Sequence, residues 1–253
     1  MRILLTNDDG VDAPGLAILR RIAATLSDDV WVVAPAANQS GAGHRLSFAR
    51  EMVAERREDR VFAIEGGSPA DCVVYGCTHL LADRPPEIVL SGVNAGQNLG
   101  DVINCSGTAA GAREGVMQGA IGIALSQSID YQAGRTVDWS NAESYGARIV
   151  RQLVASSPGR DVYYNVNFPT CAPEDVSGLR VVPHQRFARS PFAHYPSDNP
   201  GKFFIAIPRT PTPLDPEADF EVLRGDAVTV TPLSLVLTDY DEIARLGGSL
   251  DLA

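Results

Sequence analysis

Short apolar segments alternate along the first two thirds of the chain with segments whose apolar residues recur every three or four positions. The apolar segments have the length of β-strands and predict strands at residues 2–6, 30–34, 61–65, 87–90, 121–126 and 162–167. The periodic segments predict helices at residues 14–26, 69–81, 108–118 and 141–155. This alternation predicts an α/β fold, with a mostly parallel sheet covered by helices on both faces.

The pattern changes after residue 168, because ten prolines lie between residues 169 and 216. Proline cannot donate to the hydrogen-bond ladder of a sheet, so this segment is unsuited to central strands. We expect extended arms and hairpins that reach another subunit, before a strand returns at residues 227–231. The predicted organisation is an α/β catalytic core at residues 1–168 and oligomerisation arms with a returning strand and helix at residues 169–253, within one structural domain.

Composition narrows the class of protein. The 253 residues are 45% hydrophobic, which suffices for the core of one large α/β domain, and no apolar run approaches the roughly 20 residues of a membrane span. A net charge of −10 disfavours a nucleic-acid polymer as partner. The cysteines form no CxxC pair and are expected to be reduced thiols: Cys72, Cys77, Cys105 and Cys171. We therefore expect a cytoplasmic protein, without a membrane partner, that acts on a small molecule.

Polar residues directly follow the first predicted strand, at the sheet edge where open α/β proteins bind ligands. They are Asn7, Asp8, Asp9 and Gly10. Adjacent carboxylates repel each other unless a cation lies between them, and Gly10 lets the chain turn so that both can face one. A turn closed by an Asx hydrogen bond explains the same residues without any ligand.

The loop after the second strand, residues 34–45, consists largely of small residues. Ser40 can offer an oxygen to a metal ion, while Gly41 and Gly43 allow backbone N–H groups to approach an anion. A flexible connection is the alternative interpretation. His44 and Arg45 either contact a substrate or face solvent.

Two further segments carry candidate ligands. Residues 91–101 follow the strand at 87–90 and contain two asparagines, Asn94 and Asn98, and the carbonyl oxygen of an asparagine side chain is a neutral ligand suited to Mg²⁺ or Mn²⁺. Asparagine also tolerates left-handed turns, which is the structural alternative. Residues 105–111 lead into a helix, whose first N–H groups can bind phosphate beside the hydroxyls of Ser106 and Thr108. Either hydroxyl is also explained as a helix N-cap.

Motifs of rival chemistries are absent from the sequence: there is no GxxxxGK[ST], no GxGxxG after the first strand and no GxSxG. NDDGVD does not match the DxDx[TV] motif of aspartyl-phosphate phosphatases, so metal-activated water is preferred to a covalent nucleophile. Two other functions stay open. An oxidoreductase or glycosyl-transferring protein would need a dinucleotide or sugar-nucleotide loop after the first strand, and a non-catalytic metal or nucleotide sensor would keep the same pocket.

Four segments in order, MRILLTNDDGVDAPG, VVAPAANQSGAG, LSGVNAGQNLGDV and SGTAAGAREG, closely resemble the SurE survival-protein family of nucleotidases. The resemblance is strong over roughly the first 130 residues. The proline-rich second part resembles the family only in its general composition. It implies a Rossmann-like SurE fold and a homodimer or homotetramer joined partly by C-terminal arms. It also implies hydrolysis of nucleoside 5′- or 3′-monophosphates and, as in some members, of short polyphosphate.

The resemblance further implies a set of site residues. The family's ligands for one divalent cation per subunit, Mg²⁺ or Mn²⁺, fall on Asp8, Asp9, Ser40 and Asn94, with Asp8 and Asp9 as catalytic residues. Its phosphate pocket falls on Gly41, Asn98, Ser106, Gly107 and Thr108. The group that takes the proton from the attacking water stays open, with Asp9 as one candidate.

The chain departs from the family pattern at a few positions outside the ligand set. The family often has a charged pair where this chain has Ala36 and Ala37, and often has tyrosine in place of Cys105. These differences bear on substrate preference and leave metal binding untouched.

Overall fold

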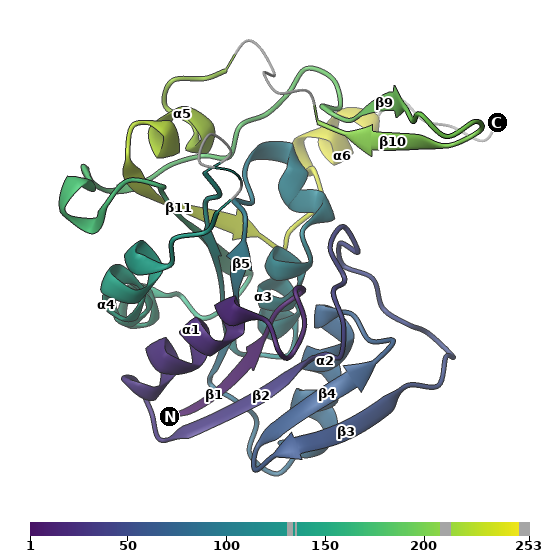
Figure 1. Cartoon of the computed structure of the whole chain (residues 1–253), viewed down its shortest axis with the longest axis vertical. Coiled ribbons are helices and arrows are strands. Elements are labelled where there is room, and N and C mark those ends of the chain that lie inside the picture. Colours follow the sequence, from purple (N-terminus) through teal and green to yellow (C-terminus); the bar gives the residue numbers. More distant parts are fainter. Residues whose placement is uncertain (131–133, 135, 208–213, 248–253) are drawn as a thin grey trace.

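The computed structural model describes residues 1–130, 134, 136–207 and 214–247, so Pro208, Pro211 and Pro213 of the proline-rich segment lie outside the described residues. The strands of its main sheet are β1 (Arg2–Thr6), β2 (Asp29–Pro35), β3 (Val53–Glu58), β4 (Val61–Glu65), β5 (Ile88–Ala95), β6 (Ile121–Gln127), β7 (Val162–Phe168), β8 (Gly178–Val181) and β11 (Ala227–Ser234). Over the described residues they form a nine-stranded sheet in the order β3-β4-β2-β1-β5-β6-β7-β11-β8 (Figure 1).

Parallel pairing joins all the neighbours from β4 through β2, β1, β5 and β6 to β7. Antiparallel pairs occur only toward the edges of this described sheet, between β3 and β4 and between β7 and β11. The central strands are buried on both faces, which explains why β1 reads as a continuous apolar run rather than an alternating one. The expected α/β fold with a mostly parallel sheet is confirmed.

Helices cover both faces of the sheet. Ile3 and Leu5 of β1 pack in one core with α1 (Pro14–Ala24) and α4 (Ser140–Ser156), whereas Leu4 packs in a second core with α2 (Pro69–Tyr75). Helix α3 (Gly107–Met117) contacts α2 and lies on that second face. None of the helices in the described part of the chain combines the length and apolar character that crossing a membrane requires.

Several elements differ from the sequence-based prediction. Strand β5 continues to Ala95, with a register shift between Ser91 and Asn94, so Asn94 lies in a strand and not in the expected loop. The helix expected at 69–81 is α2 followed by one π-helical turn, η1 (Gly76–Leu80). Strand β3 was not predicted, because all six of its residues are exposed and show no alternation.

The C-terminal part of the chain contains more regular structure than its prolines indicate. Besides β8 and β11 it forms η3 (Pro173–Asp175), α5 (Asp219–Arg224), α6 (Tyr240–Leu246) and a hairpin of β9 (Ala193–Pro196) and β10 (Phe203–Ala206). The hairpin projects from the body of the molecule, as expected for an arm (Figure 1). The returning strand β11 is longer than expected and ends at Ser234.

Three glycines spaced four residues apart let α3 lie against β1 and β5. A Cβ atom at Gly111 would come within 2.7 Å of the side chains of Thr6 and Ser91, and one at Gly115 within 2.5 Å of Val89 Cβ. A Cβ at Gly107 would lie 2.7 Å from Asp8 Cβ. The helix therefore approaches the sheet more closely than any side chain would permit, and its N-terminus meets the end of β1.

Gly115→Ala tests this close approach. Alanine adds about 1 kcal/mol of helix propensity, but the clash with Val89 forces the helix away from the sheet, and we expect a net loss of about 1–3 kcal/mol in the free energy of unfolding. Urea denaturation measures it. Gly146→Ala in α4 is the matched control, because its added Cβ meets the movable end of Ile22. Equal stabilities of the two variants would contradict the account.

Candidate active site

The candidate site lies at the carboxyl end of β1, where successive connections leave toward β2 on one side and β5 on the other. Backbone hydrogen bonds bring the surrounding segments to this point. Gln39 N donates to Asp8 O at 2.7 Å, which ties the loop after β2 to the end of β1, and Gly43 N donates to Cys105 O at 3.1 Å. Together these contacts join three of the four segments singled out in the sequence.

The two adjacent carboxylates at the end of β1 point in different directions. Asn7 closes the turn, since its Nδ2 donates to Gly10 O at 2.8 Å. Asp8 is buried, and its Oδ1 accepts from Thr108 Oγ1 of α3 at 2.7 Å. Asp9 Oδ2 instead accepts from the backbone N–H of Ala95, at the end of β5, at 3.1 Å. The Asx turn considered from the sequence is therefore present, and it holds a pair of carboxylates that face different neighbours.

Burial and mutual repulsion act on these carboxylates. Burial raises the pKa of Asp8 above its ordinary value, the hydrogen bond from Thr108 offsets part of this rise, and the negative charge of Asp9 adds to it. Burial also raises the pKa of Asp9, with the Ala95 N–H acting in the opposite direction. Two carboxylates that are adjacent in the chain and partly or fully removed from water are stabilised by a positive charge placed between them.

Ser40 and Asn94 carry neutral oxygens on the segments that contact the carboxylates, because each is adjacent in the chain to a residue whose backbone N–H bonds to Asp8 or Asp9. The amide Nδ2 of Asn94 donates to Gly96 O at 2.7 Å, which leaves its Oδ1 as the acceptor for a ligand. Ser40 is exposed, and its backbone N–H donates to Asn38 Oδ1 at 2.8 Å, which fixes the turn that carries it. The four side chains offer only oxygen donors, and this set fits a hard divalent cation. In the described part of the chain, no three His, Cys, Asp or Glu side chains gather in an arrangement that could hold a metal ion, so the oxygens of Ser40 and Asn94 would have to complete the set.

The N-terminus of α3 lies directly beside Asp8. Ser106 caps this helix, since its Oγ accepts from Ala109 N at 3.0 Å, and the Thr108 hydroxyl is already donated to Asp8. Both hydroxyls therefore have structural partners, as the N-cap alternative predicts for Ser106. The N–H of Gly107 belongs to the first helical turn, which has no intrahelical acceptor for it, and it is suited to bind a phosphate oxygen, whereas the Thr108 N–H acts on the Asp8 carboxylate.

Asn98 and Gly41 differ in their surroundings. Asn98 is buried, its Nδ2 donates to Ser126 Oγ at 2.9 Å, and its backbone N–H and C=O bond to the side chain of Asn167. Asn165 Nδ2 adds a second bond to Asn98 O at 2.8 Å. Gly41 is exposed with a φ of 78° and open space around its Cα. Gly41 is thus accessible to a ligand, whereas Asn98 chiefly shapes the chain around it.

The sequence-based prediction missed the residues that brace the segment after Asn98. Asp219 is fully buried and accepts from the backbone N–H groups of Gly100 at 2.8 Å and Gln185 at 2.9 Å. Asp101 accepts from Phe187 N at 2.8 Å. These contacts join segments far apart in the chain, so no local pattern reveals them. The one signal in the sequence was the pair of asparagines in β7, Asn165 and Asn167, whose side chains bond to Asn98.

His44 and Arg45, considered as substrate contacts or solvent-facing residues, both bond to other parts of the protein. His44 Nε2 lies 2.8 Å from Glu114 Oε2, and Glu114, a buried residue of α3, also accepts from Gln118 at 2.7 Å. Arg45 donates to Gln39 Oε1 at 2.9 Å within the loop. The loop that carries Ser40 is thereby fastened to α3.

The contacts of Glu114 favour its ionised form, and this form stabilises the folded protein. Burial alone would raise the pKa of Glu114, but the hydrogen bonds from His44 and Gln118 and the charge of Arg113 outweigh it and hold the pKa below the ordinary value of 4.5. A carboxyl group with a lowered folded-state pKa stabilises the protein above its unfolded-state pKa. That contribution disappears as the pH falls through the folded-state value.

Glu114→Gln removes this titration while keeping a hydrogen-bonding side chain of the same shape. Between about pH 6 and about pH 3 the free energy of unfolding should decrease less in this variant than in the native protein. Urea denaturation at a series of pH values measures the slope. Exposed Glu51 provides the control, Glu51→Gln, which should keep the native slope. Identical slopes for Glu114→Gln and the native protein would refute the role assigned to Glu114.

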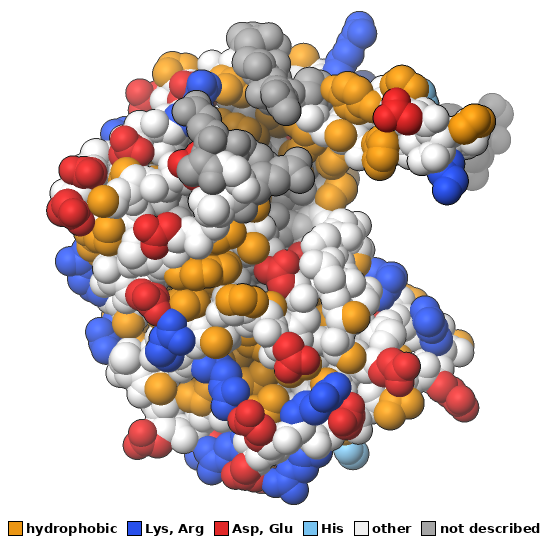
Figure 2. All heavy atoms as spheres, viewed as in Figure 1, with side chains coloured by type: hydrophobic (Ala, Val, Ile, Leu, Met, Phe, Trp, Pro, Cys, Tyr) orange, Lys and Arg blue, Asp and Glu red, His pale blue; other side chains and the backbone are white. Residues whose placement is uncertain are grey.

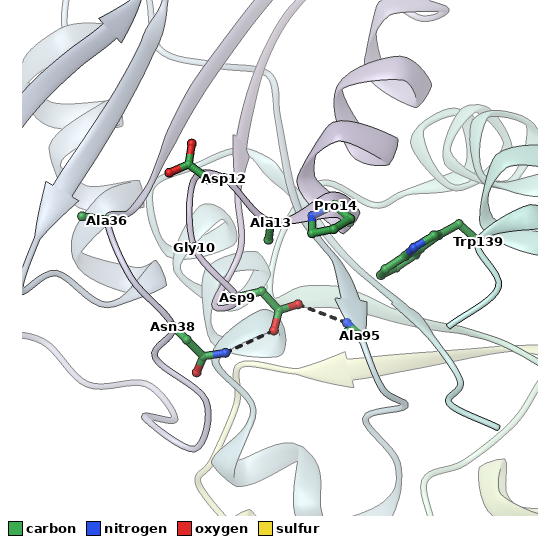
Figure 3. A pocket seen from close by; sticks show the side chains of 10 residues that line it. Asp9, Gly10, Asp12, Ala13, Pro14, Ala36, Asn38, Ala95 and Trp139 are labelled. Atoms are coloured by element: carbon green, nitrogen blue, oxygen red, sulfur yellow. Dashed lines mark hydrogen bonds between the residues drawn. The ribbon is translucent and has the colours of Figure 1, made fainter. Parts of the chain in front are cut away.

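A cavity of about 380 Å³ opens on the Asp9 side of the site. It is lined by the turn between β1 and α1, by the first residues after β2, and by Ala95 and Trp139. Figure 3 shows the Asp9 carboxylate between Asn38 and Ala95, with the indole of Trp139 on the side of Ala95 and Pro14. The carboxylates thus have the α3 N-terminus on one side and a cavity on the other.

Comparison with known proteins agrees with this architecture. The family model described as "Survival protein SurE" matches residues 3–190. A protein named "5′-nucleotidase SurE" from Brucella canis is 42% identical over 253 residues, covering 99% of this chain and 98% of its own length. A protein of the same name from Brucella anthropi is 41% identical, with 99% and 97% covered.

A solved structure shares the whole fold. The crystal structure of the SurE protein from Aquifex aeolicus matches with a TM-score of 0.86 and 32% sequence identity, over 99% of this chain and 100% of that chain. The fold implied by the resemblance is therefore confirmed. Since the family match spans most of the chain and the structural match nearly all of it, this protein belongs to the SurE family.

Proposed function

We propose that this member of the SurE family is a divalent-metal-dependent 5′-nucleotidase, which hydrolyses nucleoside 5′-monophosphates to nucleoside and phosphate. The observation that carries the proposal is the position of Asp8 and Asp9, between the N-terminus of α3 and a cavity. Each of the three elements suits one part of the reaction. The carboxylates can bind a cation, the start of the helix can bind a phosphoryl group, and the cavity can bind the rest of the substrate. The relatives named above as 5′-nucleotidases support the same reaction.

Asp8, Asp9, Ser40 and Asn94 would hold one Mg²⁺ or Mn²⁺. Bound there, the cation supplies positive charge for a phosphate oxygen and lowers the pKa of a water molecule. The protein keeps the ligands oriented, because Thr108 fixes Asp8 and the Ala95 N–H fixes Asp9 before any substrate arrives. Ligands held in place need no reorganisation during the reaction.

The start of α3 would neutralise the negative charge of the phosphoryl group. Its first N–H group, at Gly107, has no acceptor within the helix, and the absence of a side chain at Gly107 lets α3 come against Asp8. The phosphoryl group and the cation are thereby kept close together. Gly41, exposed at the tip of the opposite loop, offers a further N–H.

The proposal includes a wider substrate range and a cellular location. Phosphoryl binding through backbone N–H groups does not distinguish the ester position, so we extend the activity to 3′-monophosphates and to short polyphosphate. The four cysteines are unpaired, as is usual for proteins of a reducing compartment, and we place the enzyme in the cytoplasm.

We also propose that the enzyme forms a homodimer or homotetramer through its C-terminal arms. Hydrophobic side chains cover the projecting β9–β10 hairpin and the neighbouring surface (Figure 2). Phe203, Phe204 and Ile205 of the hairpin and Leu237 and Tyr240 near α6 are each more than half exposed. Large apolar residues gathered on a protruding arm are stabilised when a second subunit covers them.

Asp8→Asn tests the metal site. An amide removes one negative charge but keeps the shape, so we expect weaker Mn²⁺ binding in calorimetry and at least about a 100-fold lower rate of phosphate release from adenosine 5′-monophosphate. Asp28→Asn, an exposed carboxylate at the opposite end of the sheet, serves as control. Circular dichroism verifies that both variants are folded.

Native protein stripped with EDTA completes this test. Phosphate release should cease and return on addition of Mg²⁺ or Mn²⁺, across a panel of 5′- and 3′-monophosphates and short polyphosphate. Full activity of folded Asp8→Asn would refute the metal role. If the metal-loaded native protein released no phosphate from any of these substrates, the result would instead favour a binding protein.

Phe203→Asp combined with Phe204→Asp tests the arm. Placing two charges on the hairpin should convert the oligomer to a monomer, because desolvating them in an interface is costly. Sedimentation velocity measures the change in mass. Phe48→Asp is the control, since Phe48 is 85% exposed but lies outside the arm. A native protein that is already monomeric would overturn the proposed assembly.

A further inference from the structure

We propose that the cavity beside Asp9 is the subsite for the nucleoside, and that the indole of Trp139 is the surface on which the nucleobase stacks. This inference rests on the proposed nucleotidase function and adds to it a specificity-determining residue. The cavity of about 380 Å³ falls in the range of sites for small molecules. It adjoins Asp9, one of the candidate metal ligands, so a nucleoside bound there would be close enough to carry the phosphate that reacts at the cation.

The charge of the cavity favours an uncharged occupant. Among the residues that the structure describes, the charged side chains that line it are Asp9 and Asp12, both acidic, and none of the described lining residues is cationic. A free phosphate group would be repelled there, whereas the start of α3 on the other side of the carboxylates attracts one. The phosphoryl group and the uncharged remainder of the substrate are thus directed to opposite sides of Asp9.

The walls of the cavity suit a flat aromatic ring. Apolar surfaces come from Ala13, Pro14, Ala36 and Ala95, and Trp139 is the one aromatic residue among the described residues that line the cavity. Figure 3 shows that indole reaching toward Pro14 and the Asp9 carboxylate. Stacking on an aromatic side chain accepts every nucleobase, because each has a π face. We therefore expect binding of the base with little discrimination among bases.

Trp139 also has a structural contact, which the test has to separate from stacking. A Cβ at Gly15 would lie 3.0 Å from Trp139 Cη2, so the edge of the indole packs against the first turn of α1. The side chain is only partly buried, which leaves part of the ring for a ligand. Ribose 5-phosphate offers the required comparison, since it carries the sugar and the phosphate of the nucleotide but no base.

The first experiment measures kcat/KM for adenosine 5′-monophosphate and for ribose 5-phosphate. In Trp139→Ala the ratio of the two should fall by about 5- to 150-fold, the effect of losing one aromatic stacking surface, and Trp139→Phe should restore most of it. Trp31→Phe, at the amino end of β2, should leave the ratio unchanged. A damaged fold would lower both rates together. An unchanged ratio in folded Trp139→Ala overturns the proposal.

A second experiment does not depend on catalysis. The chain has two tryptophans, so Trp31→Phe leaves Trp139 as the single fluorophore. Titration with adenosine should quench or shift its emission in a saturable manner, and uridine should do so too. No change up to millimolar adenosine overturns the subsite. Saturable quenching in a protein that hydrolyses no phosphate ester supports the subsite and refutes the nucleotidase function alone.

Discussion

Helix α3 lies so close to β1 and β5 that its inner face has room only for glycine, and the geometry of the site depends on this contact. Gly111 and Gly115 set the distance along the sheet, and Gly107 brings the first turn of the helix against Asp8. Were α3 held away by side chains, the Thr108 hydroxyl would no longer reach Asp8. The same contact stabilises the fold and aligns the helix start with the carboxylates.

The pair of carboxylates divides the site into two electrostatic halves. On the α3 side, backbone N–H groups present partial positive charge, and on the other side Asp9 and Asp12 present negative charge beside apolar walls. A phosphate monoester has a matching asymmetry, with a charged group at one end and an uncharged group at the other. Under the proposed function, such a substrate would be oriented by electrostatics before any specific hydrogen bond forms.

Sequence patterns predicted the parts of the fold that depend on local hydrophobicity. The apolar runs of β1 and β2 and the periodic pattern of α4 predicted elements close to those observed. Strand β3 escaped prediction, because an exposed strand at the edge of a sheet does not need an apolar face, whereas the β9–β10 hairpin was expected only as an arm without defined bounds. Asn94 was placed in a loop although it lies within β5, since the glycines and asparagines there resemble turn residues.

The candidate site was predicted where a motif is contiguous and was missed where partners are distant in sequence. Asp8 and Asp9 are adjacent in the chain, and the structure places both at the expected sheet edge. The pairing of His44 with Glu114 and the bonds of Asp219 depend on how the chain folds back, and no spacing encodes them. Trp139 had no recognisable motif around it.

The bond between Gly100 and Asp219 has a consequence for how the protein is made. The acceptor follows the donor by 119 residues, and it is fully buried once the bond has formed. While the chain is being synthesised, the strands β1, β2 and β5 leave the ribosome long before α5 does. The segment around Asn98 is braced only after the C-terminal region has been released and has packed beside β7. A growing chain thus carries its pair of aspartates and the residues that line the cavity early, but the segment after Asn98 is fixed only near the end of translation, so that a protein truncated before α5 would leave the Gly100 N–H without its buried acceptor.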